Sequence, residues 1–518
     1  MKTKITTTII LCMLLTYVGC DDSYLYEPNP NQQTISSFWK TADDAQRATI
    51  ACYAGLQEEG TFKRWFDIAF EGRADLIYSS TEFGAQVNFT TFNIINYNED
   101  PFQTEMWRDH YRGVFRTNQV ITYVPEIPMD EDLKNQLIAE AKFVRALLYF
   151  NLVNLWGNVA LQLTPSNPNV LPPYATEQEV WGQIIQDLTE AQTFLPDVYA
   201  NPTTELGRAT RGAARALLGK AYMQLKNWGA AKIEFEKVIT SPANYALATD
   251  YGDNFRHTNE NNKESVFEVQ FSNEFNGWFW DKDLPTTSEG YRRGTYFAPR
   301  FAAGNADLTC RPWFIEKFFE EKTISGDYDP RLYTTFLWND TTNGKTDVLY
   351  YGKSFKTNIE PNKINHVYCR KYLQDQFLEQ ENEHSPINHR VIRYADVLLM
   401  YAEALNELGS TDQAYQYINQ VRARVQLRPL EIAHPEIGND RDKMRSQIMD
   451  ERILELGGEN VRWTDLKRWD MLATQSGIDF LKSHDAEFKN FEVGKNHLLP
   501  ILTREIDLNP NLKQNDGY

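Results

Sequence analysis

The chain has 518 residues, 42% of them apolar and 24% charged, with no low-complexity tract. These are ordinary globular values, so they exclude a fibrous or largely disordered protein and predict a substantial buried core. The formal net charge of −18, which becomes −20 once Lys2 and Lys4 leave with a predicted leader, excludes nucleic acid as an expected partner because such a surface repels phosphate.

The first nineteen residues have the pattern of a bacterial export signal. Lys2 and Lys4 form a positive start, and the apolar run from Ile9 to Val18 is too short to span a bilayer. We therefore predict a signal peptide over 1–19, with a plain secretory signal as the alternative to the lipoprotein signal described next.

The end of this leader resembles the lipobox of bacterial lipoproteins. Gly19 precedes Cys20, which would become the acylated first residue, although Tyr17 stands where lipoboxes prefer leucine. Asp21-Asp22 resembles the tag that sends lipoproteins of Bacteroides-type bacteria to the cell surface. We expect lipidation at Cys20, an extended tether over 20–34 and a surface-exposed protein anchored to the outer membrane, since acyl chains hold a protein on a bilayer.

The remaining cysteines give no sign of a disulfide framework or a metal site. Apart from Cys12 and Cys20, the chain has Cys52, Cys310 and Cys369, an odd number at wide spacing without any zinc-binding pattern. We predict buried thiols and no bound metal.

The folded part is expected to begin near Ile35 and to be mostly helical. Thr41 can cap a helix that follows it, and Asp43 and Asp44 suit the positive end of that helix. This helix and a second one through residues 107–120 form a possible first pair within 41–125.

A period near 34 residues, typical of tetratricopeptide helix pairs, gives the clearest fold signal. Small and large residues recur at the same offsets of 3, 12, 16 and 19 in two segments, one within 208–240 and one within 390–425. The matching positions are Gly219, Tyr222, Ala231, Phe235 and Val238 in the first segment, and Ala402, Leu405, Ala414, Ile418 and Val421 in the second.

A further pair is predicted over 132–195, where apolar residues from Leu137 to Leu155 share one helical face and 177–195 supplies the partner helix. The Pro-rich stretch from Pro165 to Pro173 interrupts this pair. In contrast, 241–388 is irregular and aromatic, with short β-like runs such as Ser265 to Phe271. The predicted fold is mostly α, a single large domain over 35–518 of about four helix pairs with a long loop and short-strand insertion.

Five segments in order, together with the lipobox, resemble the SusD/RagB family of nutrient-binding outer-membrane lipoproteins over nearly the whole chain. These segments are 139–161, the repeat RGAARALLGKAYMQLKNWGAAKIEFEKVI, the run Arg393 to Ala404, the group Asp450-Glu451-Arg452 with Glu459, Arg462 and Asp465 to Trp469, and the tail 498–518. The family usually has a Glu-Gly pair before the arginine, whereas here Glu459 is followed by Asn460.

The resemblance implies a non-catalytic receptor that binds oligosaccharide or polysaccharide at the cell surface and passes it to a SusC-like TonB-dependent barrel. It also implies that the helix pairs face the barrel and that the insertion over 241–388 faces the ligand. No cofactor is expected.

A glycan receptor needs aromatic planes beside polar side chains, because a sugar offers apolar C–H faces and rows of hydroxyls. The densest such region is 273–301, although its rings could equally form a local core under the loops. The candidate glycan-binding residues here are Trp278, Phe279, Trp280, Tyr291, Arg292 and Tyr296.

A second candidate site lies in the run from Glu71 to Tyr78. Arg73 and Asp75 can hold sugar hydroxyls with charge-assisted hydrogen bonds, and an ordinary structural ion pair is the alternative. We interpret the dense charges Arg462, Asp465, Lys467 and Arg468 as structural, since such pairs beside tryptophan commonly lock helix ends.

Two other function classes compete with glycan binding. A glycoside hydrolase needs only two suitably spaced carboxylates, which any acidic chain can supply, but no HExxH, GxSxG or phosphate-loop motif is present. A repeat scaffold that binds only protein would explain the helix pairs but not the aromatic insertion. We therefore expect no enzymatic activity.

Overall fold

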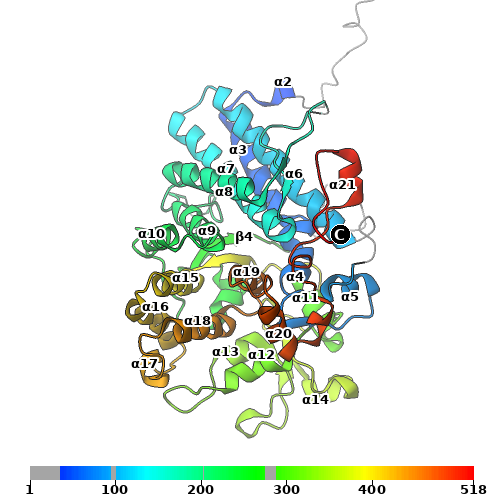
Figure 1. The fold of residues 1–518 in the computed structure, drawn as a ribbon, viewed down its shortest axis with the longest axis vertical. Coiled ribbons are helices and arrows are strands. Elements are labelled where there is room, and N and C mark those ends of the chain that lie inside the picture. The colour runs from blue at the N-terminus through cyan, green and yellow to red at the C-terminus, as the bar shows by residue number, and fades with distance from the viewer. Residues whose placement is uncertain (1–34, 95–100, 168, 202, 275–287) are drawn as a thin grey trace, which may run out of the picture.

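The computed structural model describes residues 35–94, 101–167, 169–201, 203–274 and 288–518, and over these ranges the chain is mostly helical (Figure 1). Consecutive helices pack as pairs, and each pair contacts the next through α6 and α7, α8 and α9, and α10 and α15. The pairs are α3 (Ala42–Ala54) with α6 (Pro101–Tyr123), α7 (Glu131–Trp156) with α8 (Glu177–Phe194), α9 (Arg211–Gln224) with α10 (Trp228–Ile239), and α15 (Tyr394–Glu407) with α16 (Thr411–Arg424). The predicted mostly α fold with tetratricopeptide-like pairing is confirmed.

The N-terminal cap of α3 is the one that the sequence predicts. The Thr41 hydroxyl accepts a hydrogen bond from the Asp44 amide at 3.2 Å, and the Asp44 carboxylate accepts one from the Thr41 amide at 2.8 Å. This reciprocal capping box satisfies two backbone donors that a helix end leaves unpaired.

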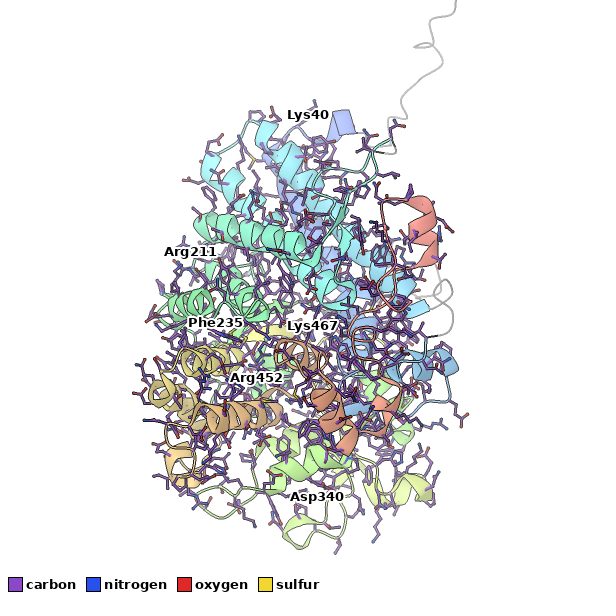
Figure 2. All side chains as sticks on the ribbon, viewed as in Figure 1. Lys40, Arg211, Phe235, Asp340, Arg452 and Lys467 are labelled. Atoms are coloured by element: carbon purple, nitrogen blue, oxygen red, sulfur yellow. The ribbon has the colours of Figure 1, made fainter. Side chains whose placement is uncertain are left out.

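The repeat positions explain how close α9 and α10 approach each other. Gly219 on α9 faces the Phe235 ring on α10, and a Cβ on Gly219 would lie 2.4 Å from Cε1 of that ring. Phe235 itself is completely buried, and Figure 2 labels its position among the packed helices. The glycine at this repeat position is therefore required by the packing, because no larger residue fits without moving the ring.

Replacing this glycine tests the packing. We expect Gly219→Val to lower the free energy of unfolding by about 1–3 kcal/mol, the usual cost of overpacking a close contact. Gly182→Val is the matched control, since Gly182 lies inside α8 and a Cβ added there would have nothing within 4 Å. Urea unfolding of both variants checks this, and equal stability of the two would contradict the close contact.

Most of the remaining elements other than α18 are short, and most belong to the insertion and the C-terminal third. The further helices are α2 (Ile35–Phe38), α4 (Trp65–Phe70), α5 (Gly84–Thr90), α11 (Arg293–Phe297), α12 (Pro312–Glu316), α13 (Arg331–Thr335), α14 (Phe355–Asn358), α17 (Leu430–Ala433), α18 (Arg441–Leu456), α19 (Arg462–Arg468), α20 (Gln475–His484) and α21 (Thr503–Leu508). The antiparallel strand pairs are β1 (Ile77–Ser79) with β5 (Leu308–Cys310), β2 (Val159–Ala160) with β3 (Tyr174–Ala175), β4 (Ser265–Val269) with β10 (His389–Arg393), β6 (Phe336–Leu337) with β9 (Tyr368–Cys369), and β7 (Leu349–Tyr350) with β8 (Lys353–Ser354). The β-like run predicted at Ser265 is thus a strand, β4.

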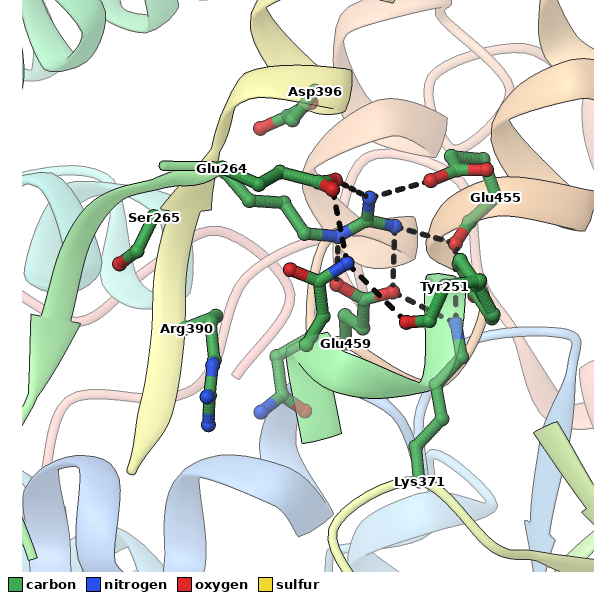
Figure 3. A network of polar contacts seen from close by, with 12 residues as sticks. Tyr251, Glu264, Ser265, Lys371, Arg390, Asp396, Glu455 and Glu459 are labelled. Atoms are coloured by element: carbon green, nitrogen blue, oxygen red, sulfur yellow. Dashed lines mark hydrogen bonds and ion pairs between the residues drawn. The ribbon is translucent and has the colours of Figure 1, made fainter. Parts of the chain in front are cut away.

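A buried ionic network joins the helix pairs to the insertion (Figure 3). Its centre is the guanidinium of Arg393, at the end of β10, which lies 2.7 Å from carboxylate oxygens of Glu264 and Glu459 and 2.5 Å from one of Glu455. Lys371 of the insertion also pairs with Glu459, at 2.7 Å. All five side chains are enclosed, so segments far apart in sequence are held by charges that water does not screen.

Candidate functional site

The candidate site is built on a tight turn that precedes α4. The π-helical turn η3 (Glu59–Lys63) runs so close to α6 that a Cβ on Gly60 would lie 2.2 Å from the Glu105 carbonyl oxygen. The Gly60 amide donates to the Asp109 carboxylate of α6 at 2.9 Å. Only glycine permits this approach, and the turn delivers Arg64 and Trp65 to one place at the start of α4.

From this turn, four rings form a continuous aromatic row that leads from the interior to the surface. The Trp65 ring lies 6.0 Å from Tyr296 and 4.7 Å from Phe102, and Phe102 lies 5.9 Å from Phe83. Trp65 and Tyr296 are buried, whereas Phe83 is 52% exposed. We call Phe83, Phe102, Trp65 and Tyr296 the aromatic row.

The charged member of the site is Arg64, whose guanidinium carbon lies 3.8 Å from the centre of the Trp65 ring. Its Nε donates to the hydroxyl of Tyr296, and its Nη1 lies 3.8 Å from the Glu59 carboxylate. The cation is thus fixed over an indole face by contacts at both ends, which holds a planar donor beside the row.

Acidic side chains that can accept hydrogen bonds lie next to the aromatic row, and Asp307 is one of them. Burial raises the pKa of Asp307 above its usual value, although hydrogen bonds with Thr81 and Asn305 and the charges of Arg300 and Arg64 oppose this rise. Glu105 is a second acceptor, and its carboxylate accepts a hydrogen bond from the Trp65 indole N–H at 2.5 Å. Ring faces with adjacent donors and acceptors can bind a polyhydroxylated ligand.

The structure places three of the predicted glycan-binding residues inside the protein. Tyr291 is fully buried and stacks on Phe271 at 4.8 Å, with its hydroxyl 3.1 Å from Nδ1 of His389. Arg292 is also buried and lies 3.2 Å from the Glu59 carboxylate, and Tyr296 is the inner end of the aromatic row. These side chains therefore support the site from beneath and do not present a free face to solvent.

Arg73 and Asp75 are buried as well, and they do not pair with each other. Arg73 stacks over Trp463 at 4.4 Å and donates to the Asn496 carbonyl at 2.7 Å. Asp75 accepts two hydrogen bonds from Arg462, at 2.7 and 2.8 Å. Although burial alone would raise it, the pKa of Asp75 is held well below its usual range by Arg462 and His484. The structural ion pair that was the alternative interpretation is what the structure shows for Asp75.

The charged C-terminal group is structural, as predicted. Arg462 binds Asp75, Asp465 binds Arg452 at 2.7 Å, and Arg468 binds Glu403 at 2.5 Å, all of them buried. Lys467 lies 3.3 Å from the Glu177 carboxylate of α8. These contacts tie α19 to the helix pairs.

Three predicted rings, Trp278, Phe279 and Trp280, lie outside the described residues, as does Cys20. Residues that follow this segment in the chain contact the site: the Ser288 carbonyl accepts a hydrogen bond from Lys63 of η3 at 2.6 Å, and Tyr296 in α11 belongs to the aromatic row. A role of Trp278, Phe279 and Trp280 in glycan binding stays a prediction.

Sequence reasoning missed Arg64, Trp65 and Phe83. The sequence does contain a signal, since aromatic residues are frequent between positions 62 and 83, but their helical spacing is also typical of a buried core. Within the described ranges, no group of three His, Cys, Asp or Glu side chains is placed to hold a metal ion, and no helix is both long and apolar enough to cross a membrane.

Comparison with known proteins gives matches over almost the whole chain. Residues 235–518 match the model of the SusD family, and residues 36–223 match a model described as starch-binding associating with outer membrane. A SusD-like protein P2 of Formosa agariphila is 28% identical over all of both chains.

Solved structures give the same picture. A SusD superfamily protein from Bacteroides vulgatus is 26% identical with a TM-score of 0.79, covering 93% of this chain and 100% of its own. A laminarin-binding SusD-like protein is 28% identical with a TM-score of 0.74, covering 92% of this chain and 100% of its own.

Proposed function

Because the chain belongs to the SusD family, we propose that it binds oligosaccharide or polysaccharide at the cell surface and delivers it to a SusC-like TonB-dependent barrel without cleaving it. The observation that carries the binding part is the aromatic row, with Arg64 fixed over Trp65 and one ring exposed at its end. Sugar rings pack on aromatic faces while their hydroxyls bond adjacent polar groups. In this site Phe83 offers an exposed ring face, and Arg64 offers a partly exposed donor.

The class of glycan has support from one relative. The laminarin-binding SusD-like protein shares 28% of its sequence with this chain over nearly its full length, so β-glucan is the first ligand to test. Trp278, Phe279 and Trp280 enter the proposal as further rings contacting the glycan, because Ser288 and Tyr296, which follow 275–287 in the chain, contact residues of the same site.

The proposed cellular location rests on the leader and on the family. We propose that Cys20 carries the lipid, that 20–34 spans the distance from the membrane, and that the paired helices contact the barrel. The match of residues 36–223 to proteins described as starch-binding and associating with the outer membrane supports this location. A SusC-like barrel co-purifying with the tagged full-length protein from outer membranes is the expected result, and its absence would remove the transport part of the proposal.

Two alternatives lead to different results with glycans. A glycan array probed with the full-length protein separates them: a glycan receptor binds at least one glycan, a protein-only scaffold binds none, and a glycoside hydrolase releases shorter sugars from the bound chains. We expect binding without release. Failure to bind any glycan on an array that includes laminarin, starch, xylan and mannan would contradict the proposal.

Arg64 gives a prediction specific to the site. Arg64→Ala is expected to weaken binding of the glycan identified on the array by about 1–2 kcal/mol, since it removes a charge-assisted donor. Arg445→Ala is the control, because Arg445 is likewise half-buried and paired with a carboxylate but lies on α18. Calorimetric titration measures both, and equal affinities would show that the row is not the binding surface.

A further inference from the structure

A pocket of about 260 Å³ lies between the loop that joins α8 to α9 and the strand β4. α9 contacts β4, and Figure 1 shows the two elements next to each other. No residue of the aromatic row lines this pocket. Two aromatic and three charged side chains are among those that do line it: Tyr199, Tyr245, Glu205, Arg208 and Lys263. The pocket is therefore separate from the aromatic row, although its lining has the same types of residue.

Two glycines let the walls of this pocket come together. Gly207 has a φ of +80°, and a Cβ on it would lie 2.5 Å from Cδ of Gln270, which follows β4. Gly212, near the start of α9, makes room for Tyr245, because a Cβ there would lie 2.4 Å from the tyrosine hydroxyl oxygen. The fold itself thus forms the pocket, as is usual for sites that bind small ligands.

The two tyrosine rings in the pocket are fixed in place. Their hydroxyls make hydrogen bonds within the chain, at 2.8 Å for Tyr199 and 3.0 Å for Tyr245. The guanidinium carbon of Arg208 lies 5.3 Å from the centre of the Tyr199 ring, and Tyr394 stacks on Tyr245 at 6.4 Å. One face of each ring is therefore covered by the chain, and the rest of the ring is left to line the pocket. Such ring surfaces pack against the C–H faces of a sugar.

Charged groups beside the rings supply hydrogen-bond donors and acceptors. Arg208 is held by two hydrogen bonds to Glu140 of α7, at 2.7 and 2.8 Å, and lies 3.6 Å from the Glu205 carboxylate. Lys263 is exposed, and no ion pair joins its ammonium to another residue of the described ranges. An ammonium offers three donors and a carboxylate offers several lone pairs, which together match the donors and acceptors of sugar hydroxyls.

We propose that this pocket is a second carbohydrate site, which binds one terminal sugar residue or a short end of a glycan chain. Its volume is below the range of about 300–1,000 Å³ that is usual for larger ligands, so it suits a short end better than the middle of a long chain. A purely apolar ligand would leave Lys263 and Glu205 without a role in binding. The inference rests on the proposed function, because it takes a glycan as the ligand, and it adds a site on a different part of the chain.

Calorimetric titration tests the number of sites. The full-length protein is titrated with laminarihexaose, maltohexaose, xylohexaose and mannohexaose, which are short forms of glycans on the array. We expect the hexasaccharide that binds to occupy two sites per chain. Lys263→Ala should weaken one of them at least about 5-fold, the usual effect of losing a charged hydrogen-bond donor, and Arg64→Ala should weaken only the other.

Matched variants separate this pocket from a general effect of charge. Lys513→Ala is the control, because Lys513 is also exposed and also forms no ion pair with a described residue, but it belongs to the C-terminal tail. Tyr245→Ala should abolish the second site, and where this variant does not fold, the surface variant Lys263→Ala decides alone. One site per chain that Arg64→Ala weakens and Lys263→Ala leaves unchanged would overturn the inference and keep the proposed function. Binding of no glycan on the array would contradict both.

Discussion

Arg393→Met is expected to lower the free energy of unfolding by about 3–5 kcal/mol, because it removes a buried cation that three buried carboxylates share. Arg393 makes ion pairs with Glu264, Glu455 and Glu459 at 2.5 to 2.7 Å, and all of these side chains are at most 2% exposed. Removing the guanidinium leaves Arg424 paired with Glu264 and Glu455, and Arg331 paired with Glu455 at 3.1 Å. Among the described residues, Glu459 then keeps the ion pair with Lys371 alone.

Urea unfolding followed by circular dichroism measures this loss. Arg47→Met is the matched control, since Arg47 pairs with Asp43 on α3 with both side chains about two-thirds exposed, where an ion pair contributes at most about 1 kcal/mol. If both variants lost the same small amount, the network in Figure 3 would not hold the insertion to the helix pairs.

The network also explains why the family-like segments carry so much charge. Arg393 begins the run that resembles the family, and Glu455 and Glu459 follow Arg452 on and after α18. Their burial means that these charges fix how segments of distant sequence meet, and they do not form a ligand site.

The second large effect concerns the aromatic segment. Trp278→Ala and Trp280→Ala are each expected to weaken glycan binding by about 1–3 kcal/mol, roughly 5- to 150-fold in the dissociation constant, with no loss of the fold. An exposed tryptophan gives a sugar ring a large flat contact at low entropic cost, so removing it costs mainly binding.

Calorimetry on the two variants provides the measurement, and unfolding by urea confirms that they are folded. Trp228→Ala is the control, because Trp228 is partly buried at the start of α10, in the helix pairs and outside the insertion. Unchanged affinity in both insertion variants would eliminate Trp278 and Trp280 as binding residues and leave the binding to the aromatic row.

The fold could be predicted where one residue decides a local contact. Gly219 and Phe235 occupy two of the repeat positions because the helices pack closely only if a small residue faces a large one. Thr41 and Asp44 cap a helix by contacts within four positions. Such information lies in short stretches of sequence, so periodicity is enough to find it.

The site could be predicted only in part, because burial depends on long-range contacts. Tyr291 and Arg292 have the composition of a binding loop, but Phe271, His389 and Glu59, which enclose them, come from other segments. Asp75 pairs with Arg462, which lies 387 positions later in the chain. Conversely, Arg64 and Trp65 resemble a core helix in sequence and reach the candidate site only because Gly60 lets their turn approach α6.

The central claim is that this chain binds a glycan and leaves it intact. Calorimetric titration of the full-length protein with the glycan selected on the array, followed by chromatography of the same sample for newly formed reducing ends, tests it most directly. We predict saturable binding with the glycan recovered at its original length. Shortened products, or no heat of binding with any glycan on the array, would contradict it.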